Sequence, residues 1–199
     1  MNEFQIEAFI YSCQKESLKL HFNNKNDGVA RYMFNKGEIE DKTFIQVISE
    51  QKQLLDGLGT GVCFNMAAWV MELLYSMDID EFYFMESENG YWSNFVVLFN
   101  TYEGYKICDL AAEVRKNEEL ISSLVDAEKE ELQDLQNRIK NPANLIQTPE
   151  QYVKEYPIEL CTVLQHQGNE DTLYYEVPRI GLKEFLAKQN SSKKSPNAY

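Results

Sequence analysis

Residues 59–69 read Gly59-Thr60-Gly61-Val62-Cys63-Phe64-Asn65-Met66-Ala67-Ala68-Trp69, a glycine-containing turn followed at once by an apolar run that starts near a cysteine. Apolar residues continue at helical spacing, so the pattern predicts a helix from about Cys63 to Met77 that is buried on most sides. The N-terminus of a helix carries unpaired N–H groups and a positive dipole end, which favour a thiolate over a thiol and can bind an oxyanion. Cys63 is therefore predicted to be a nucleophile, and the most reactive of the cysteines.

Three strand-like runs follow this helix, at residues 81–85, 92–99 and 104–110. Short polar links separate them, at residues 86–90 and 100–104, and links of this length typically join antiparallel neighbours. A cysteine-headed helix followed by an antiparallel meander predicts an α+β fold.

The remaining pattern adds helices and two further strands around this centre. Helices are predicted over residues 3–21, from Asp41 or Thr43 to about residue 55, over residues 111–140, and after the capping box Thr148-Pro149-Glu150-Gln151. Strands are predicted at residues 158–164 and 172–177, and a last helix at residues 182–188. We interpret residues 1–189 as a single domain and residues 190–199, rich in Ser, Lys and Asn, as a disordered tail.

Composition excludes several classes of function. The formal charge of −13 at pH 7 opposes binding to phosphate backbones and to anionic membrane surfaces, so neither nucleic acid nor membrane is expected as a partner. The N-terminus is acidic where a signal peptide is basic, and we expect a cytoplasmic protein. The cysteines lack any CxxC pairing, and no Lys-Ser or Lys-Thr pair follows the glycines, so no metal, disulfide framework, nucleotide or other cofactor is expected.

The order of elements resembles the transglutaminase-like and papain-like cysteine enzymes over residues 57–111. Three segments carry the resemblance: Gly61-Val62-Cys63 with its helix, Asn94-Phe95-Val96-Val97-Leu98-Phe99, which is similar to the family's histidine strand, and Tyr105-Lys106-Ile107-Cys108-Asp109-Leu110, which is similar to its aspartate strand. The resemblance implies a core of that type, with Cys63, Asn94 and Asp109 converging at one cleft. Residues 111–140 depart from the minimal core and are interpreted as an interaction or lid element.

Asn94 is the departure from the family pattern. The family has a histidine there, which takes the thiol's proton while the aspartate holds the imidazole; asparagine can hydrogen-bond both neighbours but cannot exchange a proton near pH 7. The chain has two histidines, His21 and His166, and both are interpreted as solvated surface groups. Asp109 has an equally supported second interpretation, as the cap of the helix that starts near Ala111.

Two classes of function remain. In the first, which we favour, the chain is a degenerate transglutaminase-like domain, a pseudoenzyme that binds a peptide, acyl or protein ligand in a cleft around Cys63 without efficient turnover. In the second, it is an active thiol-dependent acyl-transfer enzyme, of protease, amidase, transglutaminase or N-acyltransferase type, whose base comes from elsewhere. Under the first hypothesis, Asn94→His is predicted to supply the missing proton carrier.

Overall fold

The computed structural model describes residues 1–22, 49–50, 52–53, 56–61, 63–79, 81–88, 93–124, 129–133, 145–155, 160–165, 175–180 and 182–193. Several predictions lie outside these residues: most of the helix that begins at Asp41 or Thr43, residues 134–140 of the long helical stretch, the loop that carries His166, and residues 194–199.

One antiparallel sheet forms the centre of the molecule, with the strand order β6-β5-β4-β3-β7-β8. The strands are β3 (Phe82–Glu88), β4 (Ser93–Thr101), β5 (Gly104–Cys108), β6 (Ile146–Gln147), β7 (Leu160–Gln165) and β8 (Tyr175–Ile180). Neighbouring pairs β3–β4 and β4–β5 confirm the predicted meander, although β3 continues past Met85 to Glu88. The hairpin of β7 and β8 joins the sheet beside β3 and leaves β8 at the edge, where a strand tolerates Pro178.

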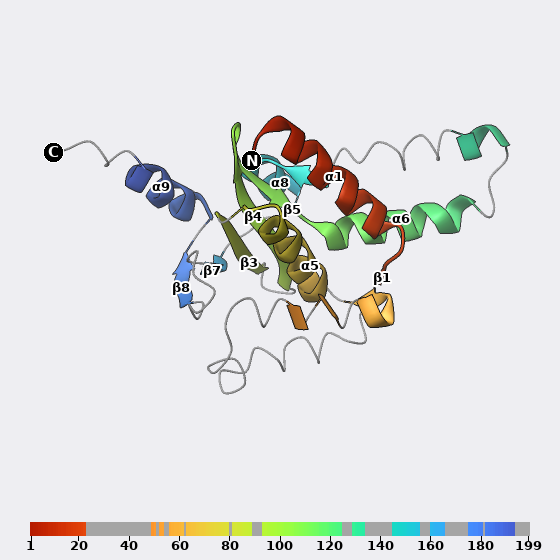
Figure 1. Ribbon diagram of the computed structural model, residues 1–199, viewed down its shortest axis with the longest axis horizontal. Coiled ribbons are helices and arrows are strands. Elements are labelled where there is room, and N and C mark those ends of the chain that lie inside the picture. Colours follow the sequence, from red (N-terminus) through yellow and green to blue (C-terminus); the bar gives the residue numbers. More distant parts are fainter. Residues whose placement is uncertain are drawn as a thin grey trace.

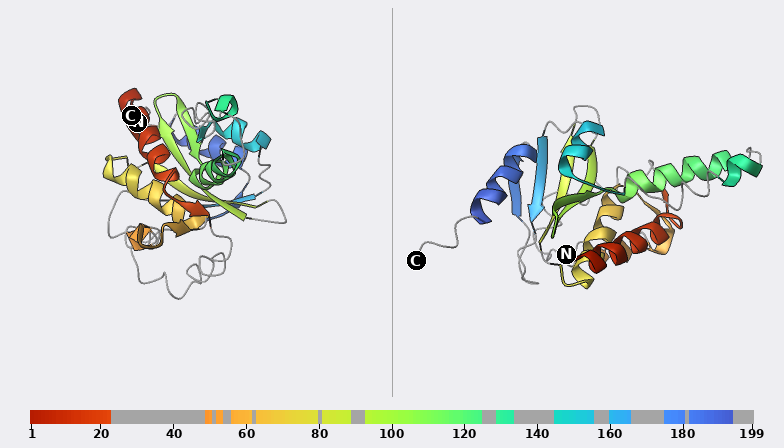
Figure 2. Two further views of the ribbon diagram at one scale, coloured as in Figure 1. Left: turned by 90° about the vertical axis from the view of Figure 1, so that its right-hand side faces the viewer. Right: turned by 90° about the horizontal axis from the view of Figure 1, so that it is seen from above.

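Helices cover both faces of the sheet, so the fold is α+β in three layers (Figures 1 and 2). One face carries α1 (Glu3–Ser17), α5 (Cys63–Ser76) and α6 (Leu110–Leu124), and the other carries α8 (Pro149–Glu155) and α9 (Leu182–Lys193). The predicted capping box holds the start of α8, because the Thr148 N–H donates to Gln151 Oε1 at 2.9 Å and the Gln151 N–H donates to Thr148 Oγ1 at 3.2 Å. None of the helices in the described part of the chain is long and apolar enough to cross a membrane.

Two predicted boundaries are wrong. The first helix ends at Ser17, and His21–Phe22 instead form β1, which pairs in parallel with β2 (Thr60–Gly61). At the other end, α9 continues to Lys193, so residues 190–193 belong to a helix and not to a disordered tail. The Ser191 hydroxyl donates to the Lys188 carbonyl within this added turn.

Separate apolar clusters fill the two faces. The larger lies between the sheet and helices α1, α5 and α6, and includes Phe9, Cys63, Phe64, Met66, Phe84, Phe95, Val97, Phe99 and Cys108. The smaller lies under α8 and α9, and consists of Tyr83, Met85, Val96, Leu98, Ile107, Tyr152, Leu182 and Phe185. Residues of β4 enter the two clusters alternately, as side chains of a strand must.

Candidate functional site

Cys63 is the first residue of α5, and the chain reaches it through a turn at Gly59 and then β2. Gly59 takes φ = +63°, a left-handed conformation that strains any residue with a Cβ, so the turn before β2 depends on this glycine. β1 pairs with β2, and the His21 N–H donates to the Gly59 carbonyl at 2.9 Å, which holds the turn in place. The predicted helix that begins with cysteine is confirmed.

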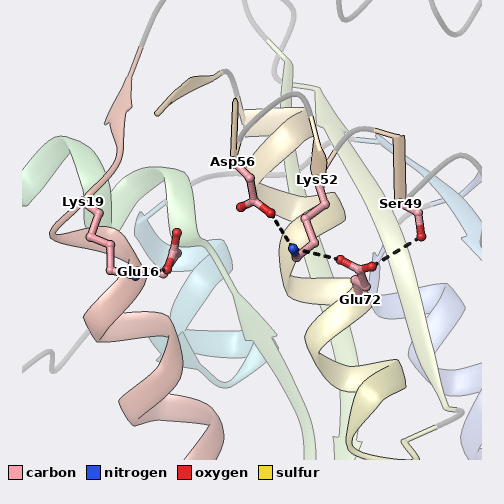
Figure 3. A network of polar contacts seen from close by, with 6 residues as sticks. All are labelled: Glu16, Lys19, Ser49, Lys52, Asp56 and Glu72. Carbon is pink, nitrogen blue, oxygen red and sulfur yellow. Dashed lines mark hydrogen bonds and ion pairs between the residues drawn. The ribbon is translucent and has the colours of Figure 1, made fainter. Parts of the chain in front are cut away.

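A polar network fixes the chain before this turn to the side of α5 (Figure 3). Lys52 Nζ contacts the carboxylates of Asp56 and, at 3.7 Å, of Glu72 on α5, while the Ser49 hydroxyl donates to Glu72 at 3.4 Å. The hydrogen bond with Asp56 raises the pKa of Lys52, so its ammonium form is favoured. The network connects the segment before the Gly59 turn to the helix that carries Cys63.

Asn94 and Asp109, the two residues that the hairpin spacing predicts to meet, are hydrogen-bonded. The Asn94 amide donates to Asp109 Oδ2 at 2.8 Å and to the Tyr152 hydroxyl oxygen at 3.0 Å, and the Tyr152 hydroxyl lies 3.2 Å from the same Oδ2. The second oxygen, Asp109 Oδ1, accepts the Ala112 N–H at 2.9 Å. Asp109 thus caps α6, as its second interpretation predicted, and also closes a buried triangle with Asn94 and Tyr152.

Burial decides the electrostatics of this triangle. All three side chains are buried, and burial raises the pKa of the Asp109 carboxyl above its ordinary value of 3.8. The Ala112 N–H, the Asn94 amide, the charge of Arg115 and the Tyr152 hydroxyl oppose that rise, because each favours the carboxylate. The proton on Asp109 is therefore held more tightly than in the unfolded chain.

The predicted convergence of Cys63 with Asn94 and Asp109 is wrong, because Cys63 lies on the other face of the sheet. On β4, Phe95 belongs to the cluster that contains Cys63, and its ring contacts Phe64 at 5.5 Å. Its neighbour Asn94 must point the opposite way, and its amide indeed contacts Tyr152 of α8. A histidine at position 94 would point toward Tyr152 and Asp109, and would leave Cys63 without a base from this strand.

His21 lies on β1, which pairs with β2 just before Cys63, but its side chain is directed outward. Its Nδ1 lies 3.2 Å from Glu118 Oε1 on α6, and the side chain is largely exposed. The next residue, Phe22, turns into the larger cluster, so the alternation of β1 sends His21 outward. His166, the other histidine of the chain, lies outside the described residues.

Tyr152 is the site residue that sequence reasoning missed. Its position in α8 was predicted, but its contact with Asp109 spans 43 residues and depends on how α8 packs over the sheet. A tyrosine one residue after a capping box carries no signal of that long-range partner. No group of three or more His, Cys, Asp or Glu side chains in the described part of the chain could hold a metal ion.

Burial predicts the order in which three of the cysteines react with a thiol reagent. Cys13 and Cys108 are 0% and 1% exposed, whereas Cys63 is 7% exposed. A hydrogen bond with Cys13, together with burial, raises the pKa of the Cys108 thiol and disfavours its reactive thiolate. In the native protein we expect iodoacetamide to modify Cys63 before Cys13 and Cys108, as read by peptide mass spectrometry over time. Labelling of Cys13 or Cys108 ahead of Cys63 would contradict this order.

Comparison with protein-family models, with curated proteins and with solved structures finds no match to this chain.

Proposed function

We propose that this chain is a degenerate transglutaminase-like domain that binds a peptide, acyl or protein ligand near Cys63 and does not turn it over. The observation that carries the proposal is the placement of Asn94: a buried amide, hydrogen-bonded to Asp109, on the opposite face of the sheet from the cysteine. The position that the family gives to its base holds a group that neither exchanges protons nor reaches the thiol.

This placement argues against turnover. A nucleophilic thiol needs a base within hydrogen-bond reach, about 2.6–3.2 Å, and a positioned general base contributes about 10²- to 10⁴-fold in rate. Cys63 packs in the larger apolar cluster, which also contains Phe64, Phe84 and Phe95, and Asn94 of β4 points to the other face of the sheet.

The surface around the turn before Cys63 supports binding. Leu58 is an exposed large apolar side chain that directly precedes Gly59, and the turn leads through β2 to the first residues of α5. The positive dipole end of a helix N-terminus favours a nearby carbonyl or carboxylate oxygen, to which backbone N–H groups can donate. An apolar contact beside such donors suits the ligand classes that the resemblance implies.

The alternative is an active thiol-dependent enzyme that takes its base from outside β4. One observation favours it: His21, on the strand that pairs with β2, forms a histidine–carboxylate pair with Glu118 of α6. A carboxylate orients the imidazole in sites of this class. The exposed position of His21 weighs against it, because the ring is directed away from the core that contains Cys63.

Hydrolysis of p-nitrophenyl acetate separates the two functions. We expect the wild-type chain and Cys63→Ala to hydrolyse this ester at the same slow rate, and His21→Ala and Asn94→His to leave that rate unchanged. A fall of about 10²-fold or more in both Cys63→Ala and His21→Ala would establish the enzyme alternative and overturn the proposal.

Binding is measured on the same proteins by hydrogen exchange. Addition of N-acetylated peptides or a fatty acyl amide is expected to protect the backbone amides of residues 59–66, and Leu58→Asp is expected to weaken that protection. Ile121→Asp, at an exposed apolar residue on α6, is the matched control. Protection elsewhere in the chain, with residues 59–66 unaffected, would place the ligand at another surface.

A further inference from the structure

The outward face of α1 carries a stripe of large apolar side chains that the core does not use. Phe4, Tyr11 and Leu18 are 81%, 65% and 50% exposed. They are seven residues apart in sequence, which places them on one face of the helix and at its C-terminal cap. The buried residues of α1 are Phe9, Cys13 and Ser17, so the stripe lies outside the inner face of the helix.

Charged residues flank the stripe in an order that is complementary to itself. Glu7 precedes Tyr11 and Lys15 follows it by the same number of residues, and both side chains are exposed. Farther out, Phe4 and Leu18 are likewise equidistant from Tyr11, as are Glu3 and Lys19. The ion pairs found among the described residues include neither Glu7 nor Lys15. Lys19 is paired with Glu16 at 2.8 Å.

We propose that this face binds a second copy of the chain, with the two α1 helices antiparallel and a two-fold axis at Tyr11. In that arrangement Phe4 packs on Leu18 of the other copy, the two Tyr11 rings meet at the axis, and Glu7 faces Lys15 twice. Each Glu7–Lys15 pair then lies between the Tyr11 contact and a Phe4–Leu18 contact. A two-fold axis requires such self-complementarity.

The surroundings of α1 leave room for this partner. The helix lies on the outside of its layer, with its inner face on α5 and α6 (Figures 1 and 2). Tyr102, also exposed, lies beside the start of α1, because its N–H donates to the Met1 carbonyl at 3.0 Å. The apolar surface is thus continued at that end of the helix by the turn between β4 and β5.

The size of the surface predicts a weak dimer. An aromatic side chain buries about 150–250 Å² when covered, so the four α1 aromatics of two copies give roughly 600–1,000 Å², below the ~1,200–2,000 Å² of standard interfaces. The two chains also repel, since each has a formal charge of −13. At physiological ionic strength charges are screened beyond about 8 Å, so the short-range contacts decide. We expect a dissociation constant in the micromolar range.

Sedimentation equilibrium of the full chain at physiological ionic strength tests the dimer and its register. Wild type is expected to dimerise, and Glu7→Lys or Lys15→Glu alone to weaken the dimer about tenfold, because each change replaces two attractive pairs by two repulsive ones. The exchange Glu7→Lys with Lys15→Glu is expected to restore wild-type affinity. An equimolar mixture of the two single variants is expected to form heterodimers.

Cysteine cross-linking checks the position of the axis. Tyr11→Cys is expected to form a disulfide-linked dimer on mild oxidation, whereas Phe4→Cys alone is not, because the two copies of position 4 lie about 21 Å apart along the helix axis. A mixture of Phe4→Cys and Leu18→Cys is expected to link. A monomer at all concentrations, a dimer that these charge changes leave unaffected, or cross-linking of Phe4→Cys with itself would each overturn the proposal.

Discussion

Asp109→Ala is expected to lower the free energy of unfolding by about 3–5 kcal/mol, the range for breaking a buried network that contains a charged group. The change removes the acceptor of the Asn94 amide, of the Tyr152 hydroxyl and of the Ala112 N–H together. The three donors stay buried in the folded variant, so water cannot replace the lost oxygen atoms at low cost. Urea unfolding followed by circular dichroism measures the difference.

Exchange of the two polar partners is the control. Asp109→Asn places an amide donor against the Asn94 amide, and Asn94→Asp places a second carboxylate beside Asp109, so each single change is expected to cost about 1–3 kcal/mol. The double exchange keeps one carboxylate, one amide and an oxygen for Ala112, and is expected to cost less than the sum of the two. Additive costs would show that the hydrogen bond between positions 94 and 109 contributes little.

The pH dependence of the same variants follows from the raised pKa of Asp109. Because the folded state holds this proton more tightly than the unfolded state, the contribution of Asp109 to stability is greatest at low pH and falls as the pH rises above 3.8 toward the folded value. The stability difference between wild type and Asp109→Asn is therefore expected to shrink over that window. Burial also raises the pKa of Glu113, but that residue is present in both proteins and cancels.

Phe9→Ala is expected to destabilise the fold by a similar amount, about 3–5 kcal/mol, the usual cost of truncating a buried phenylalanine. Phe9 is fully buried on the inner face of α1, and its ring centroid lies 5.2 Å from that of Phe99 on β4. The pair joins the first helix to the centre of the sheet. A double-mutant cycle with Phe99→Ala is expected to show about 0.5–1.5 kcal/mol of coupling.

Phe4→Ala on the same helix is the matched control. Phe4 is exposed, so the stability of the dilute chain is expected to change by no more than about 0.5 kcal/mol. If the two substitutions cost the same, the inner and outer faces of α1 would be assigned wrongly. The same result would remove the free apolar surface on which the proposed dimer depends.

Local patterns predicted the elements near Cys63 well. The helix from Cys63, the three strands of the meander, the capping box at Thr148 and the cap at Asp109 all depend on neighbours within a few residues or on one hairpin. The spacing of Asn94 and Asp109 also predicted their contact, since a hairpin fixes which residues of adjacent strands meet.

The face of the sheet that each side chain occupies could not be predicted in this way. Residues 94–99 of β4 are buried on both sides of the sheet, so apolar residues follow one another without alternation and give no sign of which face α5 covers. For the same reason the sequence did not show which face of the sheet α8 covers, and so it did not predict the contacts of Tyr152 with Asn94 and Asp109. In α1, apolar residues lie on two faces of one helix, and the sequence pattern does not show which face packs against the core.

The sequence by itself determined the α+β class, the helix that begins at Cys63, the antiparallel meander and the pairing of Asn94 with Asp109, because short-range periodicity, turns and caps specify these features. The tertiary structure alone decided that α5 and α8 pack on opposite faces, that Cys63 is separated from Asn94, and that a stripe on α1 stays exposed. These outcomes depend on which of several apolar surfaces pack together, and residues close in the chain do not specify that choice.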